Sequence, residues 1–253
     1  MKSTVIYLLG FFCLFFFILS VSIAITINFT PLYTFDITYL NIADEIGMTK
    51  EVILKNYGVL INYLNFPWIT ELKMSDFPSS EKGLFHFFEV KKLFLLDYVT
   101  LVISGIGSIL FLNYLKRKKG MWKLVRFFQW GSIIPPLLIV TLFINFDTLF
   151  VLFHKIFFNN DAWLFNPSTD PIILALPEAF FMHSFILAFG VIEFLFIIGY
   201  FISKKQWVKY EKKTPWIYQG VFYTGFSAYE FITSIFIKRI NCAIKLIKQK
   251  DYT

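Results

Sequence analysis

Charged residues are scarce in this chain of 253 residues: only 16% are Asp, Glu, Lys or Arg. A soluble domain carries about 25% charged residues, so this composition argues against a water-soluble globular protein. Cysteine is nearly absent, with Cys13 in an apolar run and Cys242 in a basic segment, which excludes a disulfide framework. Hydrophobic residues make up 57% of the chain and aromatic residues 21%. This balance is typical of a polytopic membrane protein.

Several signatures of catalysis and transport are missing as well. The sequence has no G-x-S-x-G elbow, no P-loop, no HExxH and no cysteine beside a histidine. It has no internal repeat, whereas many transporters are built from repeats. If the chain is an enzyme, histidine is the natural proton-transfer group, because its unperturbed pKa lies near neutrality.

Four segments are long and apolar enough to cross ~30 Å of hydrocarbon as helices. They cover approximately residues 5–27, 93–115, 127–150 and 180–202. The first segment is too long for a typical signal-peptide core and no A-x-A site follows it, so we interpret it as an anchor. Pro135-Pro136 lie inside the third segment, and we expect them to kink that helix because they lack amide donors.

Basic residues are concentrated in two connectors. Residues 116–126 hold six basic residues and no acidic one, and residues 204–213 hold five basic residues and one acidic. Connectors 28–92 and 151–179 carry more acidic than basic residues. The positive-inside rule therefore predicts cytoplasmic N and C termini and two extracytoplasmic connectors. The net charge of +7 then reflects topology and contact with anionic membrane lipids, and it requires no nucleic-acid-binding surface.

The first extracytoplasmic connector is predicted to be helical. Ile53, Tyr57 and Leu60 follow helical spacing after Thr49, which is a suitable N-cap. A second helix can begin after Ser79-Ser80 and continue into the second span.

The chain divides into a four-helix transmembrane domain over residues 1–213 and a basic tail over 214–253. Apolar residues in the tail repeat with a period near 3.6 between positions 218 and 249. We interpret this pattern as an amphipathic helix on the cytoplasmic leaflet. A tail that packs on the cytoplasmic loops is the alternative.

Polar residues gather where the predicted spans meet the outer interface. They are His86, Glu89, Asp97, Asp147, His154, Asn159, Asn160, Asp161, Asn166, Asp170, Glu178 and His183. All three histidines of the chain belong to this group, whereas Glu193 stands apart near the middle of the fourth span. Ionisable residues at membrane depth are costly and are therefore candidates for function.

Each candidate also has a structural interpretation. His86 and Glu89 are three residues apart and can pair on one helix face. His154 can stabilise the C-terminus of a helix. His183, flanked by Phe and Met, can be a buried histidine with a satisfied hydrogen bond. We interpret Asp97 as a bond to a neighbouring span, because it lies about 16 Å along the helix from His86.

Two segments resemble the lipoprotein intramolecular transacylase (Lit) family of Gram-positive bacteria. They are EKGLFHFFEVKKLF (81–94) and LFHKIFFNNDAWLFNPSTDPIILALPEAFF (152–181). The specific part is H-x-x-F-F-x-N-D-x-W, followed by N-P-x-x-D and L-P-E-x-F-F. The likeness covers approximately residues 1–213, and Glu89 stands where we would expect an aspartate.

The resemblance implies an all-α integral membrane protein that acts on diacylated lipoproteins in the cell membrane. The sn-2 acyl chain of the diacylglyceryl-modified N-terminal cysteine would move to that cysteine's own α-amine, which leaves a lyso-form lipoprotein. His86 and His154 would be catalytic, at the extracytoplasmic face, with no cofactor and no metal. The residues expected to position the substrate are Glu89, Asn159, Asp161, Trp163, Asn166, Asp170 and Glu178.

The chemistry of such a transfer fits the residues available. An α-amine has a pKa of about 7.7–8.0 and must be neutral to attack an ester. Two histidines can accept and donate the protons that the reaction moves. Two other classes stay open at this point. One is a membrane metallohydrolase in which His86, His154 and an acidic residue bind zinc. The other is a transporter or assembly factor without enzymatic activity.

Overall fold

The computed structural model describes residues 2–211, and all regular secondary structure among them is helical. The elements are α1 (Lys2–Ile27), α2 (Thr30–Tyr39), α3 (Ile42–Ile46), α4 (Lys50–Asn65), α5 (Glu81–Arg117), the 3₁₀ helix η1 (Met121–Lys123), α6 (Leu124–Gly131), α7 (Ile134–Phe157), α8 (Ile172–Ala175) and α9 (Glu178–Glu211). The amphipathic helix predicted for the tail over 214–253 lies outside the described residues.

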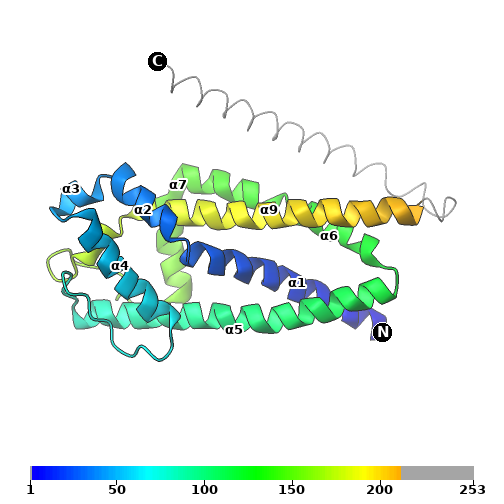
Figure 1. The fold of residues 1–253 in the computed structure, drawn as a ribbon, viewed down its shortest axis with the longest axis horizontal. Helices are drawn as coiled ribbons and strands as arrows, with labels where there is room; N and C mark the ends of the chain where they lie inside the picture. The colour runs from blue at the N-terminus through cyan, green and yellow to red at the C-terminus, as the bar shows by residue number, and fades with distance from the viewer. Residues whose placement is uncertain (1, 212–253) are drawn as a thin grey trace, which may run out of the picture.

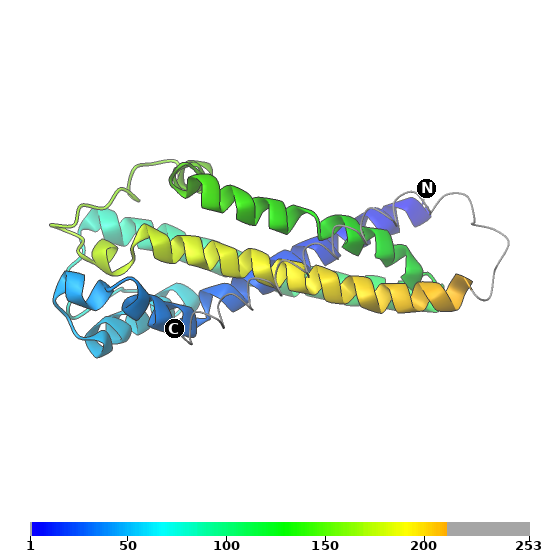
Figure 2. The ribbon, with the colours of Figure 1, turned by 90° about the horizontal axis from the view of Figure 1, so that it is seen from above.

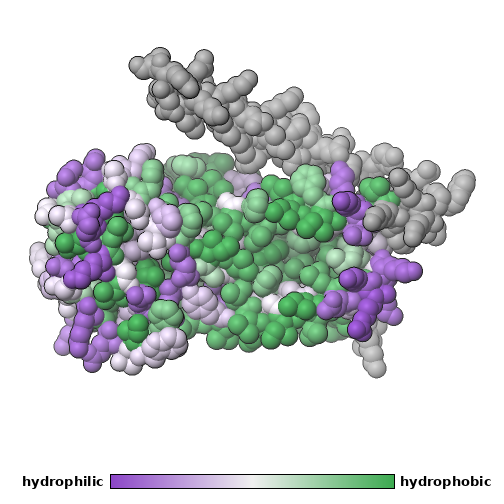
Figure 3. All heavy atoms as spheres, viewed as in Figure 1, coloured by the Kyte–Doolittle hydropathy of each residue, from purple (hydrophilic) through white to green (hydrophobic). Residues whose placement is uncertain are grey.

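The long helices α1, α5 and α9 lie lengthwise in a bundle that α6 and α7 complete (Figure 1 and Figure 2). Four stretches are long and apolar enough to cross a membrane: Ser3–Ile27, Glu81–Arg117, Met121–Phe157 and Glu178–Val208. Hydrophobic residues form a broad band across the visible face of the bundle, and hydrophilic residues gather at both ends (Figure 3). The prediction of an all-α protein with four spans is confirmed.

The first connector folds into helices α2, α3 and α4 at one end of the bundle (Figure 1). Thr49 caps α4 by accepting a hydrogen bond from the Val52 amide at 3.4 Å, as predicted. Ile53 and Leu60 of α4 are buried, and so are Tyr33 of α2 and other apolar residues of this connector. The connector thus has a hydrophobic core of its own, and its packing explains why the short helix α4 is stable.

The third predicted span, 127–150, is not a single helix. α6 ends at Gly131, and Pro135-Pro136 lie in the first turn of α7, where a missing amide donor costs little. The predicted kink is therefore a complete break between two helices. A second break occurs at Asn145, whose φ of −157° and ψ of 66° are not helical.

The part of α7 after Asn145 turns across the bundle, from the side of α9 toward α5 (Figure 1). The Asn145 side chain accepts a hydrogen bond from the Thr148 amide at 3.4 Å and so begins a new helical piece. This piece carries His154. The break thus brings a residue of the third span toward α5.

Candidate active site

Asp170 fixes the first turn of α5 to the connector between α7 and α9. Its carboxylate accepts hydrogen bonds from the Ser80 amide and the Ser80 hydroxyl, both at 2.8 Å, although the two residues are 90 positions apart. Ser80 in turn caps α5 by accepting from the Gly83 amide at 3.0 Å. A Cβ atom at Gly83 would collide with the Asp170 carboxylate, so this close approach requires glycine. A negative charge at this position is also favoured by the helix dipole.

His86 lies in the second turn of α5 and is 6% exposed. Two aromatic rings meet it edge to face: Phe158 at 4.8 Å and Phe165 at 5.5 Å between ring centroids. Its Nδ1 atom is buried and has no hydrogen-bond partner among the described residues. A buried polar atom without a partner is rare in proteins and is a sign of a site where a ligand can bind.

His154 lies in the last turn of α7 and is 8% exposed. Its Nδ1 atom lies 2.7 Å from the backbone oxygen of Phe150. Because a carbonyl oxygen only accepts, Nδ1 must carry the hydrogen, and Nε2 of the neutral ring then has the free lone pair. Trp163 stacks on the ring with 4.6 Å between centroids and helps to fix its orientation.

The two imidazoles face each other from α5 and α7. Their centroids are 5.8 Å apart and their planes are inclined by 36°. Phe158 contacts both rings. The juxtaposition was predicted from sequence, whereas the aromatic walls formed by Phe158 and Phe165 were not, because a phenylalanine among 34 gives no signal by itself.

Glu89 lies one turn beyond His86 on α5 and binds the same connector. Asn160 donates from Nδ2 to both carboxylate oxygens of Glu89, at 3.0 Å each. The Asn160 oxygen accepts from the Ala162 amide at 2.9 Å and so holds the connector in a turn. Asn159 was predicted to position the substrate but is exposed, and its neighbour Asn160 is the residue that pairs with Glu89.

The other residues that were predicted to position the substrate lie in different environments. Asn166 shapes the connector, since its side chain accepts from the Ser168 amide at 3.0 Å. Asp161 is exposed. Glu178, in the first turn of α9, interacts with Asp147 of α7. Of the residues predicted to position the substrate, Trp163 contacts a catalytic candidate directly.

Two further polar residues are structural. His183 on α9 bonds through Nδ1 to Asp36 Oδ1 at 2.8 Å, which joins α9 to the first connector. Asp36 is fully buried and was not predicted as a partner from sequence. Asp97 on α5 interacts with Ser20 on α1, which agrees with the predicted link to a neighbouring span.

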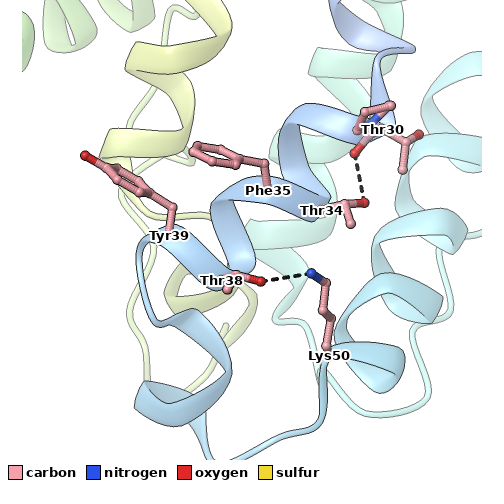
Figure 4. Close-up of a pocket in the computed structure, with 7 residues that line it drawn as sticks. Thr30, Thr34, Phe35, Thr38, Tyr39 and Lys50 are labelled. Atoms are coloured by element: carbon pink, nitrogen blue, oxygen red, sulfur yellow. Dashed lines mark hydrogen bonds between the residues drawn. The ribbon is translucent and has the colours of Figure 1, made fainter. Parts of the chain in front are cut away.

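An open hollow of about 720 Å³ lies elsewhere, against α2 (Figure 4). Thr30, Thr34 and Thr38 follow one another along its wall, and Lys50 donates to the Thr38 hydroxyl at 2.9 Å. The hollow contains none of the predicted site residues, and it offers no pair of acid–base groups comparable to the histidines. It is therefore not the candidate active site.

The zinc alternative requires a third ligand beside the two histidines. No group of three or more His, Cys, Asp or Glu within residues 2–211 has an arrangement that could hold a metal ion. Within the described residues, the two histidines therefore have no third protein ligand of the kind that the zinc alternative requires. Fold and site together define a multi-pass membrane protein with a histidine pair at the end of the bundle that carries the helical connector.

The comparisons with known proteins agree with this class. The family model of the lipoprotein intramolecular transacylase Lit matches residues 8–181. The membrane integral lipoprotein intramolecular transacylase Lit from Bacillus cereus is 33% identical, with a TM-score of 0.76 over 84% of this chain and 99% of that chain. A structure of the same Bacillus cereus protein with a histidine-to-alanine mutation is also 33% identical, with a TM-score of 0.73 over 84% of this chain and 96% of that chain. No curated protein matches the chain significantly.

The chain belongs to the lipoprotein intramolecular transacylase Lit family. It is an acyltransferase that is integral to the membrane. The metallohydrolase and non-enzymatic alternatives are not favoured.

Proposed function

We propose that the chain transfers the sn-2 acyl chain of a diacylglyceryl-cysteine lipoprotein to the α-amine of the same cysteine. The observation that carries this proposal is the facing pair His86 and His154, 5.8 Å apart between ring centroids and walled by aromatic rings. The reaction moves one proton from an amine to an alcohol oxygen within one molecule. A pair of neutral imidazoles on separate helices is suited to that transfer.

His154 is the general base in this mechanism. Its Nδ1–H is committed to the Phe150 carbonyl, so the lone pair on Nε2 is the one available to the substrate. As the amine nitrogen attacks the ester carbonyl carbon, the new C–N bond forms and Nε2 takes the proton that the nitrogen loses. Stacking on Trp163 keeps the ring in the plane that this transfer needs.

His86 stabilises the tetrahedral intermediate and helps the alcohol to leave. An N–H of its ring donates to the former carbonyl oxygen of the ester while that oxygen carries the negative charge of the intermediate. The C–O bond to the glyceryl oxygen then breaks, the carbonyl forms again as an amide, and the oxygen leaves with the proton that the histidines supply. Protons and electrons balance without an external acyl donor. Binding amine and ester together also contributes ~10⁵ M or more in effective molarity.

Glu89 and Asn160 act as positioning residues. Their two hydrogen bonds tie the connector to α5 one turn from His86, so the distance between the histidines depends on them. Asn159, Asp161, Asn166 and Glu178 complete the set that we propose for contacts with the lipoprotein near its N-terminus.

We place the site at the extracytoplasmic face, where the lipid of a mature lipoprotein lies in the outer leaflet. Six basic residues between positions 116 and 126 support a cytoplasmic location for the opposite end. A reporter fused near Lys118 should therefore be cytoplasmic, and one inserted near Asn160 should be outside. An inserted reporter at Asn160 that labels only from the cytoplasm would place the histidines on the wrong side.

Mass spectrometry of lipoprotein N-termini tests the activity in cells. Cells that express the chain should contain lyso-form lipoproteins with an N-acyl group and one remaining ester, and cells that lack it should contain the diacyl form. A matched strain that expresses the His154→Ala variant controls for the presence of the membrane protein. Diacyl lipoproteins alone in cells that contain the folded wild-type chain would contradict the proposal.

A further inference from the structure

A second hollow of about 570 Å³ lies between α1, α9 and the α6–α7 pair, far from the histidines along the bundle. Its walls are apolar rings and branched side chains, among them Phe11, Phe15 and Ile18 of α1 and Ile192 and Phe196 of α9. Several of its residues, including Trp130, have large exposed areas. In a membrane this groove opens toward lipid rather than toward water.

Two basic residues line one end of the groove. Lys123 is held there by a hydrogen bond from Nζ to the Tyr7 hydroxyl at 2.9 Å, and Nζ lies 4.2 Å above the Tyr7 ring. Arg126 is exposed one turn further along and also lines the groove. Both belong to the basic segment 116–126, so this end lies at a membrane interface.

The length of the groove matches one leaflet. On the unbroken helix α1, Leu19 lines the groove twelve positions after Tyr7, which binds Lys123, and this corresponds to ~18 Å of helix at ~1.5 Å per residue. Half of a ~30 Å hydrocarbon core is ~15 Å. An acyl chain that enters beside the basic end can therefore lie along the apolar walls until the midplane.

We propose that this groove binds a phospholipid with a net negative headgroup. Its phosphate contacts Lys123 and Arg126, and one acyl chain lies against Phe15, Ile18 and Ile192. Charge complementarity favours this occupant over a zwitterionic lipid. It also disfavours residues 214–253 of this chain, because they are basic and would bring like charge to the same end. The lipid would fill the space between α1 and the α6–α7 pair.

Quenching of Trp130 fluorescence by lipids with brominated acyl chains tests the proposal. The full chain is reconstituted in phosphatidylcholine vesicles that contain a minor fraction of brominated phosphatidylglycerol or brominated phosphatidylcholine. The Trp130 signal is the difference between wild type and Trp130→Phe. We expect stronger quenching by phosphatidylglycerol, with a relative binding constant raised roughly fivefold for each basic residue that contacts the headgroup.

Charge variants distinguish binding of anionic lipid in the groove from its general electrostatic attraction to the basic protein surface. Arg126→Gln should reduce the preference for phosphatidylglycerol, and Lys123→Gln with Arg126→Gln should abolish it. Arg117→Gln with Lys118→Gln removes the same charge outside the groove and should leave the preference intact. An equal loss in this control would overturn the proposal in favour of nonspecific attraction. Equal quenching by both lipids, or a Trp130 that neither lipid quenches because protein covers the groove, would overturn it as well.

Discussion

Replacing Asp170 by alanine should loosen the first turns of α5. The buried carboxylate accepts two hydrogen bonds from Ser80, and hydrogen bonds to a charged group contribute about 1.5–3 kcal/mol each. Its interaction with the helix dipole adds about 0.3–1 kcal/mol. Ser80 is half-buried and regains water in the variant, so we expect a net loss of ~3 kcal/mol. Since ~1.4 kcal/mol corresponds to a factor of ten, local opening should increase roughly 100-fold.

Hydrogen–deuterium exchange of the peptide that covers residues 80–90 measures this opening directly. Asp170→Asn keeps the shape of the side chain and should fall between wild type and Asp170→Ala. Ser168→Ala, an exposed change in the same connector, is the matched control and should leave exchange unaltered. The rate of acyl transfer should fall with protection, because His86 follows the cap by less than two turns. Wild-type exchange and wild-type activity in folded Asp170→Ala would refute the argument that this carboxylate holds α5 in place.

Three other changes test separate parts of the structure. Asn160→Asp should reduce activity more than Asn160→Ala, because it sets a carboxylate against Glu89, and the exposed Ser168→Asp should have little effect; equal rates for both aspartate variants would contradict this. Burial raises the pKa of Asp36 above its ordinary value of 3.8, so its contribution to stability is complete below that pH and is lost as pH rises through the raised pKa. Asp36→Asn should remove this part of the pH dependence of the melting temperature, and an unchanged profile would count against the assignment. Tyr33→Phe removes a buried 2.7 Å hydrogen bond to the Ala175 carbonyl and should cost about 1 kcal/mol or more in thermal unfolding, whereas no shift would show that the bond contributes nothing.

Local signals in the sequence predicted much of the fold. The start of α5 after Ser80 and the cap of α4 at Thr49 follow from residues within one turn of each helix. The break at Asn145 could not be read in the same way, because apolar residues continue on both sides of it and the run looks like one span. Short helices α2 and α3 were missed because their stability comes from packing against α4 and α8 rather than from their own pattern.

In the candidate site, too, local sequence signals predicted some features, whereas others depend on tertiary contacts. His86 and His154 were predicted together because both occupy the predicted outer ends of spans and each lies in one of the two segments that resemble the Lit family. The partners Asn160 and Asp36 depend on contacts across 71 and 147 positions, which no spacing in one sequence reveals. Asn159 and Asn160 have the same side chain, so the sequence does not distinguish them. The turn of the connector decides which one reaches Glu89.

Single-turnover conversion of a diacyl lipopeptide to its lyso form tests the central role of the two histidines most directly. Variants are compared at equal amounts of folded protein in detergent. His86→Ala and His154→Ala should each lower the rate by ~10²-fold or more, and the double variant should be little worse, because residues that act as a unit are not additive. His183→Ala should lower stability while each folded molecule keeps a rate within a few-fold of wild type, since His183 bonds to Asp36. A folded His154→Ala protein that converts the lipopeptide within a few-fold of the wild-type rate would contradict the account.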